Sequence, residues 1–76
     1  WRQLFKAVDE LYPDFKDTLT REIGTFNEKQ MQVFYLLRIG MERQQILMTT
    51  TLSRVTLWRW TKKYEWVMSH HDRSRV

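Results

Sequence analysis

MERQQILMTTTLSRVTLWRWTKKYEWVM, residues 41–68, is the stretch of sequence that decides the fold. Its first part carries Ile46 and Leu47 on a buried face. It ends at the threonines 49–51, because consecutive β-branched residues lose side-chain freedom in a helix. Leu52 follows as an apolar residue in a turn, and the Ser53 hydroxyl is placed to accept a backbone N–H of the next helix. The stretch therefore predicts two helices joined by a tight turn.

The second of these helices has an apolar side and a basic side. Leu57, Trp60 and Tyr64, followed by Val67 or Met68, recur every three or four residues and make one apolar stripe. The opposite side carries Arg54, Trp58, Arg59, Lys62 and, nearer the edge, Lys63. A short helix, a turn and a longer helix with a basic outer face are typical of a helix-turn-helix that places its second helix in the major groove of DNA.

The composition indicates one small domain. The chain has 76 residues and no cysteine, so neither a disulfide framework nor a thiolate zinc site is expected. Four Trp, three Tyr, four Phe and four Met supply large side chains for a core instead. No apolar run is long enough to span a bilayer and no signal peptide is recognisable, so we expect a cytoplasmic location. Because the chain starts at Trp1 without an initiator Met, we expect it to be part of a longer protein.

The positive charge lies in one half of the chain. Residues 1–40 contain six Lys or Arg and six Asp or Glu, which cancel. Residues 41–76 contain seven Lys or Arg and three Asp or Glu, so they carry the whole net charge of +4. A basic half beside a neutral half is the charge distribution expected of a nucleic-acid binder, although any solvent-exposed helix can also show basic residues.

The first part of the chain predicts a helical hairpin, residues 1–25, that supports the core. Apolar residues recur at helical spacing over residues 1–11 and again over residues 15–23. Pro13 breaks the chain between them and is suited to open the second helix, which Gly24 then ends.

A central helix is predicted next. Asn27 is placed to cap it, with Gln30 completing a capping box. Residues 31–39 are apolar on most sides, which predicts burial, and Gly40 ends the helix in a left-handed conformation. We therefore predict an all-α fold, a small bundle of about five helices. It comprises the hairpin of residues 1–25, a helix-turn-helix domain of residues 26–68 and a loose tail of residues 69–76.

The caps, apolar positions and turn residues described above follow one another in an order that occurs in a known family. They are Phe26-Asn27, the apolar positions Met31, Val33, Phe34, Leu36 and Leu37, then Gly40, Ile46, Leu52-Ser53 and Thr56-Leu57. With no gap, this series resembles the LuxR/GerE-type helix-turn-helix, and residues 4–15 are similar to the helical lead-in of such regulators. The segment 53–64 also resembles the recognition helices of resolvases and transposases.

The sequence also departs from that family. Leu47 replaces a small residue, Thr50 a leucine, and Trp60 a small residue or histidine. Trp66-Val67 replaces a basic pair, whose charge falls on Arg59, Lys62 and Lys63 instead. The resemblance implies the C-terminal DNA-binding domain of a bacterial transcriptional regulator, acting on double-stranded DNA and joined to other domains of a longer chain. A homodimer is left open.

Seven residues are candidates for DNA contact, with the recognition helix at about residues 54–68. They are Arg43, Arg54, Thr56, Trp58, Arg59, Lys62 and Lys63. Arg54 and Arg59 suit guanine edges or phosphates, the two lysines suit phosphates, and Arg43 suits the DNA backbone. Thr56 is placed either to bind a phosphate or to help Ser53 cap the helix.

The tryptophans support an alternative function. Trp58 is expected to meet a base methyl, a partner protein or the N-terminal helices, and Trp66 to cover the end of the core or mark a dimer surface. Together with the departures at Leu47 and Thr50, they are compatible with a degenerate helix-turn-helix that serves protein–protein interaction or dimerisation.

Catalysis is not expected from this sequence. It has only two glycines, no nucleophile–histidine–acid arrangement, and adjacent His70 and His71 without further ligands at a useful spacing. We therefore expect neither an enzyme nor a metal or cofactor.

Overall fold

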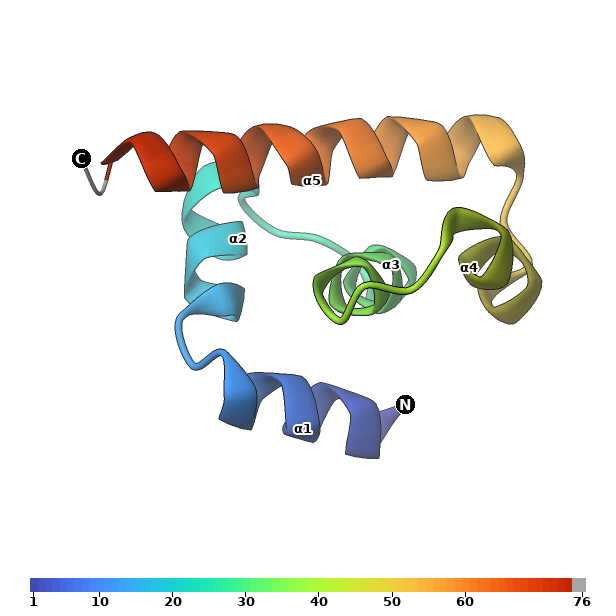
Figure 1. Cartoon of the computed structure of the whole chain (residues 1–76), viewed down its shortest axis with the longest axis horizontal. Helices are drawn as coiled ribbons and strands as arrows, with labels where there is room; N and C mark the ends of the chain where they lie inside the picture. Colours follow the sequence, from blue (N-terminus) through green and yellow to red (C-terminus); the bar gives the residue numbers. More distant parts are fainter. Residues whose placement is uncertain (75–76) are drawn as a thin grey trace.

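The computed structural model describes residues 1–74, with side chains for residues 1–69. This part of the chain forms five helices and no strand: α1 (Arg2–Leu11), α2 (Phe15–Ile23), α3 (Glu28–Arg38), α4 (Arg43–Thr50) and α5 (Arg54–Ser74). Figure 1 shows α5 running the length of the molecule, with α4 beneath its first turns, α3 beneath its middle and α2 reaching its second half. The predicted all-α fold of about five helices is confirmed.

Two adjoining apolar clusters form the core, and α3 contributes to both. The first cluster joins α1, α2, α3 and the second half of α5 through Val8, Phe15, Leu19, Phe34, Tyr35 and Val67. The second joins α3, α4 and the start of α5 through Val33, Leu36, Ile46 and Leu57. Residues 32–36 are all buried, which confirms α3 as the central helix.

The apolar stripe of α5 is also confirmed. Leu57 and Val67 are buried, and Trp60, Tyr64 and Met68 pack against the clusters. Trp60 contacts both clusters, so it joins the two halves of the core. Because the stripe packs on α2, α3 and α4 together, the orientation of α5 about its own axis is fixed.

The first two helices do not form the predicted hairpin. α1 packs on α3, α2 packs on α5, and the two helices turn away from each other instead of running side by side (Figure 1). α2 also begins at Phe15 rather than at Pro13, with Asp14 as its N-cap. The apolar side chains of the two helices meet at Tyr35 of α3, where the rings of Phe5 and Phe15 lie 5.1 and 5.3 Å from the Tyr35 ring between centroids. Phe15 also contacts the Tyr64 ring of α5, at 6.2 Å, and this second contact draws α2 onto α5.

The ends of α3 are as predicted. The Asn27 side chain accepts the Gln30 backbone N–H at 2.8 Å, and the Gln30 side chain accepts the Asn27 N–H at 3.0 Å. At the other end Gly40 has φ 87°, and the N–H groups of Gly40 and Met41 each donate to carbonyls of the last turn at 3.1 Å. This Schellman pattern satisfies carbonyls that the helix itself leaves without partners.

The turn between α4 and α5 contains a strained residue. Thr51, the C-cap of α4, has φ 57° and ψ 29°, a left-handed conformation that β-branched residues rarely adopt. Leu52 then packs into the second cluster, and Ser53 Oγ accepts the Thr56 N–H at 3.2 Å. The predictions that Leu52 is an apolar residue in the turn and that Ser53 caps the next helix are therefore confirmed.

Thr51→Gly is expected to stabilise the domain. Glycine adopts the left-handed conformation without strain, so the free energy of unfolding should rise by about 0.5–1 kcal/mol despite the greater freedom of glycine in the unfolded chain. The matched control is Thr49→Gly, at an exposed helical position of α4, which should lower stability by a few tenths of a kcal/mol. Urea unfolding measures both, and equal losses in the two variants would contradict strain at Thr51.

The end of α5 corrects the prediction for the tail. Residues 69–76 were expected to be loose, but α5 continues to Ser74, six residues beyond Met68, where the helix was predicted to end. Residues 69–74 contain neither glycine nor proline, and extending an existing helix is far easier than starting one. Residues 75–76 lie outside the described part of the chain.

Tyr35 makes the fold sensitive to alkali. Its side chain is buried, and its hydroxyl donates to Asp9 Oδ1 at 2.7 Å. Burial raises the pKa of Tyr35 well above its ordinary value, and the hydrogen bond to Asp9 raises it further. The unfolded chain therefore loses this proton at a lower pH than the folded chain does.

Tyr35→Phe is expected to reduce that sensitivity. Above the unfolded pKa of about 10, one such tyrosine makes stability fall by up to about 1.4 kcal/mol per pH unit. The Tyr35→Phe variant should lose this dependence of stability on pH. At pH 8 it should be less stable than the parent, because Asp9 loses its hydrogen-bond donor. Urea unfolding at pH 8, 10 and 11 measures the difference, and an unchanged slope would show that Tyr35 ionises without unfolding.

Candidate nucleic-acid interface

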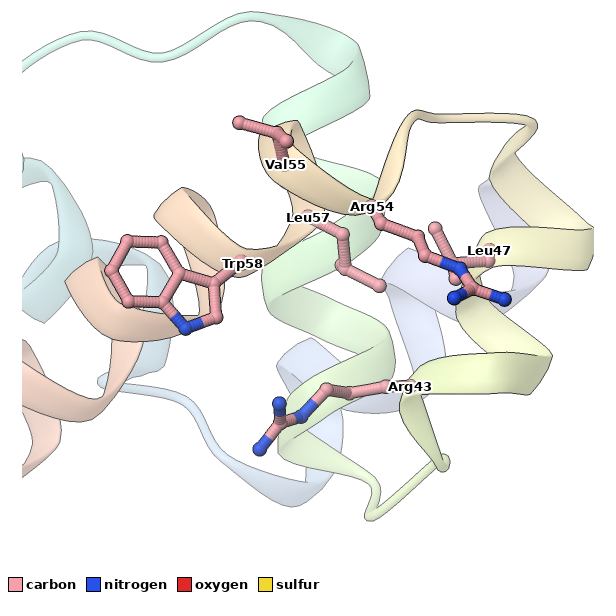
Figure 2. Close-up of a pocket in the computed structure, with 6 residues that line it drawn as sticks. All are labelled: Arg43, Leu47, Arg54, Val55, Leu57 and Trp58. Atoms are coloured by element: carbon pink, nitrogen blue, oxygen red, sulfur yellow. The ribbon is translucent and has the colours of Figure 1, made fainter.

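A groove separates α4 from the first turns of α5. It has a volume of about 360 Å³ and is lined by Arg43, Leu47, Arg54, Val55, Leu57 and Trp58. Figure 2 shows Leu57 among the other five, with Arg43 and Trp58 on different sides of the opening and Arg54 extending its guanidinium group toward Leu47. The fold therefore brings three of the predicted contact residues, Arg43, Arg54 and Trp58, around one opening.

The exposed side of α5 carries two parallel ridges. Residues four apart lie nearly in line along a helix, so Arg54, Trp58 and Lys62 form one ridge, and Val55, Arg59 and Lys63 form the next. Each ridge is about 12 Å long, from the helical rise of 1.5 Å per residue. All six side chains are exposed, as the sequence predicted for the basic residues. We call these two ridges together with exposed Arg43 the basic face.

The Lys62 side chain lies close to Trp58 and to Glu65. Its ammonium group lies 5.9 Å from the Trp58 ring centroid and 3.8 Å from Glu65 Oε2. Both side chains of the ion pair are about half exposed, and such surface pairs contribute little free energy. Glu65 therefore offsets part of the Lys62 charge without preventing Lys62 from approaching a phosphate.

Trp58 is 54% exposed and lines the groove with residues of α4 and α5 alone. The N-terminal helices are therefore not its partner, and a base methyl or a partner protein remain as interpretations.

Thr56 is part of the cap of α5. Ser53 Oγ accepts the Thr56 N–H and donates to Thr56 Oγ1, at 3.2 and 2.8 Å. Of the two predicted roles, capping is observed and phosphate binding stays a prediction.

The apolar part of the groove was not predicted from the sequence. Val55 is 63% exposed and was not singled out, although its spacing from Arg59 places it on the same ridge. Leu47, predicted to lie on the buried face of its helix, is half-buried and packs against the second cluster, but its place in the groove lining was not predicted. The other departure, Thr50, is buried and donates its hydroxyl to the Ile46 carbonyl at 2.6 Å, so a polar residue fits this core position.

A lysine from α3 supports the end of α4. Lys29 Nζ donates to the Thr50 carbonyl at 3.2 Å, which places a positive charge at the negative end of the α4 dipole. This contact links α4 to the central helix on the side where the turn into α5 begins, and so helps to fix the groove.

Two other features were looked for in the part of the chain that the structure describes, a metal-binding cluster and a membrane-spanning helix. Within them, no three His, Cys, Asp or Glu side chains gather closely enough to hold a metal ion. Nor does any helix among them combine the length and apolar character needed to cross a membrane. Comparison with models of known protein families, with curated proteins and with solved structures finds no match to this chain.

Proposed function

We propose that this domain binds double-stranded DNA in a sequence-specific manner, as the output domain of a bacterial transcriptional regulator in the cytoplasm. The observation that carries the proposal is the basic face: five exposed cations on α4 and one side of α5, while the other side of α5 is held in the core. The proposal includes no catalytic role, and the chain would act in a LuxR-like way through its helix-turn-helix.

The dimensions of α5 fit this role. A helix with its side chains is about 10–12 Å wide and the major groove of B-DNA about 12 Å, so both ridges of α5 would face DNA at once. Arg54 and Arg59, on different ridges, would then contact guanine edges or phosphates. Lys62 and Lys63 would contact phosphates farther along the helix, and Arg43 would contact the backbone beside the groove.

Arg59→Ala provides the direct test. If Arg59 contacts a base, the variant should lose about 1–3 kcal/mol of binding free energy, which is about fivefold to 150-fold in Kd. Arg21→Ala, which removes an exposed arginine of α2, is the matched control and should bind as the parent does. Selection from a random duplex pool, followed by electrophoretic mobility shift at low salt, would supply the ligand. Failure to retard any duplex would contradict the proposal.

A second candidate is a helix-turn-helix that has become a dimerisation module. The observation in its favour is exposed apolar surface on the same helices: Met48 is 76% exposed, Val55 63% and Trp66 55%. Apolar and aromatic side chains are enriched at the centres of protein interfaces. Sedimentation separates the two functions, because a dimerisation module should self-associate tightly whether or not duplex DNA is present.

A further inference from the structure

The groove between α4 and α5 combines an apolar floor with a cationic rim. Leu47 and Leu57 line it from α4 and α5, and the exposed Trp58 ring forms one wall. Arg43 and Arg54 each contribute a guanidinium group to the rim of the groove. Among the side chains that the structure describes, neither guanidinium group is within ion-pair distance of a carboxylate. The rim is thus open to negatively charged groups from another molecule.

The size of the groove indicates what it can take. A cavity of about 150 Å³ is enough to hold benzene. The groove, at about 360 Å³, therefore has room for a phenylalanine or leucine side chain together with part of its backbone. Guanidinium groups bind carboxylates through paired, charge-assisted hydrogen bonds. Carboxylates beside such a side chain would meet Arg43 and Arg54 (Figure 2).

We infer that this groove binds an acidic protein segment that inserts one bulky apolar side chain, Phe or Leu, between Arg43 and Arg54. A peptide with this chemistry uses the apolar floor, the Trp58 wall and both arginines. Duplex DNA uses less of the groove, because its phosphates are wholly polar and its only projecting apolar group in the major groove is the thymine methyl. The inference does not depend on DNA binding. Where DNA also binds, the segment competes with it for the two arginines.

Fluorescence anisotropy with a defined peptide tests the inference. The probe is a short fluorescein-labelled peptide in which one Phe and one Leu lie among Asp and Glu residues. The groove variants are Arg54→Gln and Trp58→Ala, and both replace exposed side chains. Their matched controls are Arg59→Gln and Trp66→Ala, which change an exposed arginine and tryptophan of the same helix that do not line the groove. Circular dichroism confirms that each variant is folded.

The inference requires each groove variant to weaken peptide binding about fivefold or more, and each control to change it less than about twofold. Replacing Phe and Leu of the peptide by Ala, or its acids by Asn and Gln, should each weaken binding to a similar extent. An Arg59→Gln loss as large as that of Arg54→Gln would show diffuse charge attraction and overturn the inference. So would a peptide that does not bind.

A duplex titration in the same assay separates this inference from the proposed function. Protein that binds the duplex and not the peptide overturns the inference alone. Protein that binds the peptide and not the duplex supports the inference and counts against DNA binding. If both bind, unlabelled duplex should displace the peptide.

Discussion

Raising the salt concentration from about 50 to about 200 mM should weaken binding of duplex DNA to this domain by about a hundredfold. The physical reason is the release of counterions from DNA when protein cations neutralise phosphates. The basic face holds five exposed cations, of which Lys62 already has Glu65 within 3.8 Å. Because Glu65 offsets part of the Lys62 charge, we expect the five cations to neutralise about four phosphate charges, each of which adds about −0.9 to the slope of log K against log salt.

Single substitutions should show how much each cation contributes to this slope. Lys63→Gln should reduce its magnitude by about one if Lys63 contacts a phosphate. Lys16→Gln, at an exposed position of α2, should leave the slope unchanged. Anisotropy titrations of one duplex at several salt concentrations give the slopes directly. Affinity that is nearly independent of salt would mean that apolar contacts through Trp58 and Val55, and not the cations, drive binding.

The parts of the fold that depend on neighbouring residues could be predicted from the sequence. The capping box of Asn27 and Gln30, the cap at Ser53 and the left-handed Gly40 each involve groups within a few residues of one another. The stripe and the exposed side of α5 follow from the period of the helix alone. This is why the basic side chains were correctly predicted to be exposed.

The parts that depend on distant residues could not be predicted in this way. Whether α1 and α2 pack on each other or on α3 and α5 depends on which partner their apolar faces fit. The groove lies where the fold places Arg43 and Leu47 of α4 around one opening with Trp58 of α5. Spacing along the sequence does not set that geometry. Nor does the sequence indicate the left-handed conformation of Thr51, because β-branched residues rarely adopt it.

The position of the basic face therefore depends on the core beneath it. α5 has cations on one side only because its other side is held by two clusters, and Phe34 lies in the first of them. The Phe34 side chain is fully buried, with its ring 5.8 Å from that of Phe26 and 6.5 Å from that of Tyr64, measured between centroids. It thus links the start of α3 to the middle of α5.

Phe34→Ala should accordingly lower the free energy of unfolding by about 3–5 kcal/mol, because it removes a large apolar side chain and leaves a cavity. A domain of 76 residues is expected to have a total stability of about 4–11 kcal/mol, so at the lower end of this range the variant would be partly unfolded. Urea unfolding followed by circular dichroism measures the loss. Leu11→Ala, at a position that is 68% exposed, is the control and should change stability by less than about 0.5 kcal/mol.

The effect of Phe34→Ala on DNA binding distinguishes a structural role from a contact role. Phe34 is buried, so the folded fraction of the variant should keep the parent's salt slope, while its apparent affinity falls in proportion to the fraction that is folded. Lys63→Gln should do the reverse, with unchanged stability and a reduced slope. Phe34→Ala protein that is fully folded and yet has a changed slope would show that α5 can shift on its support. Phe34 would then hold the basic face in position as well as stabilise the fold.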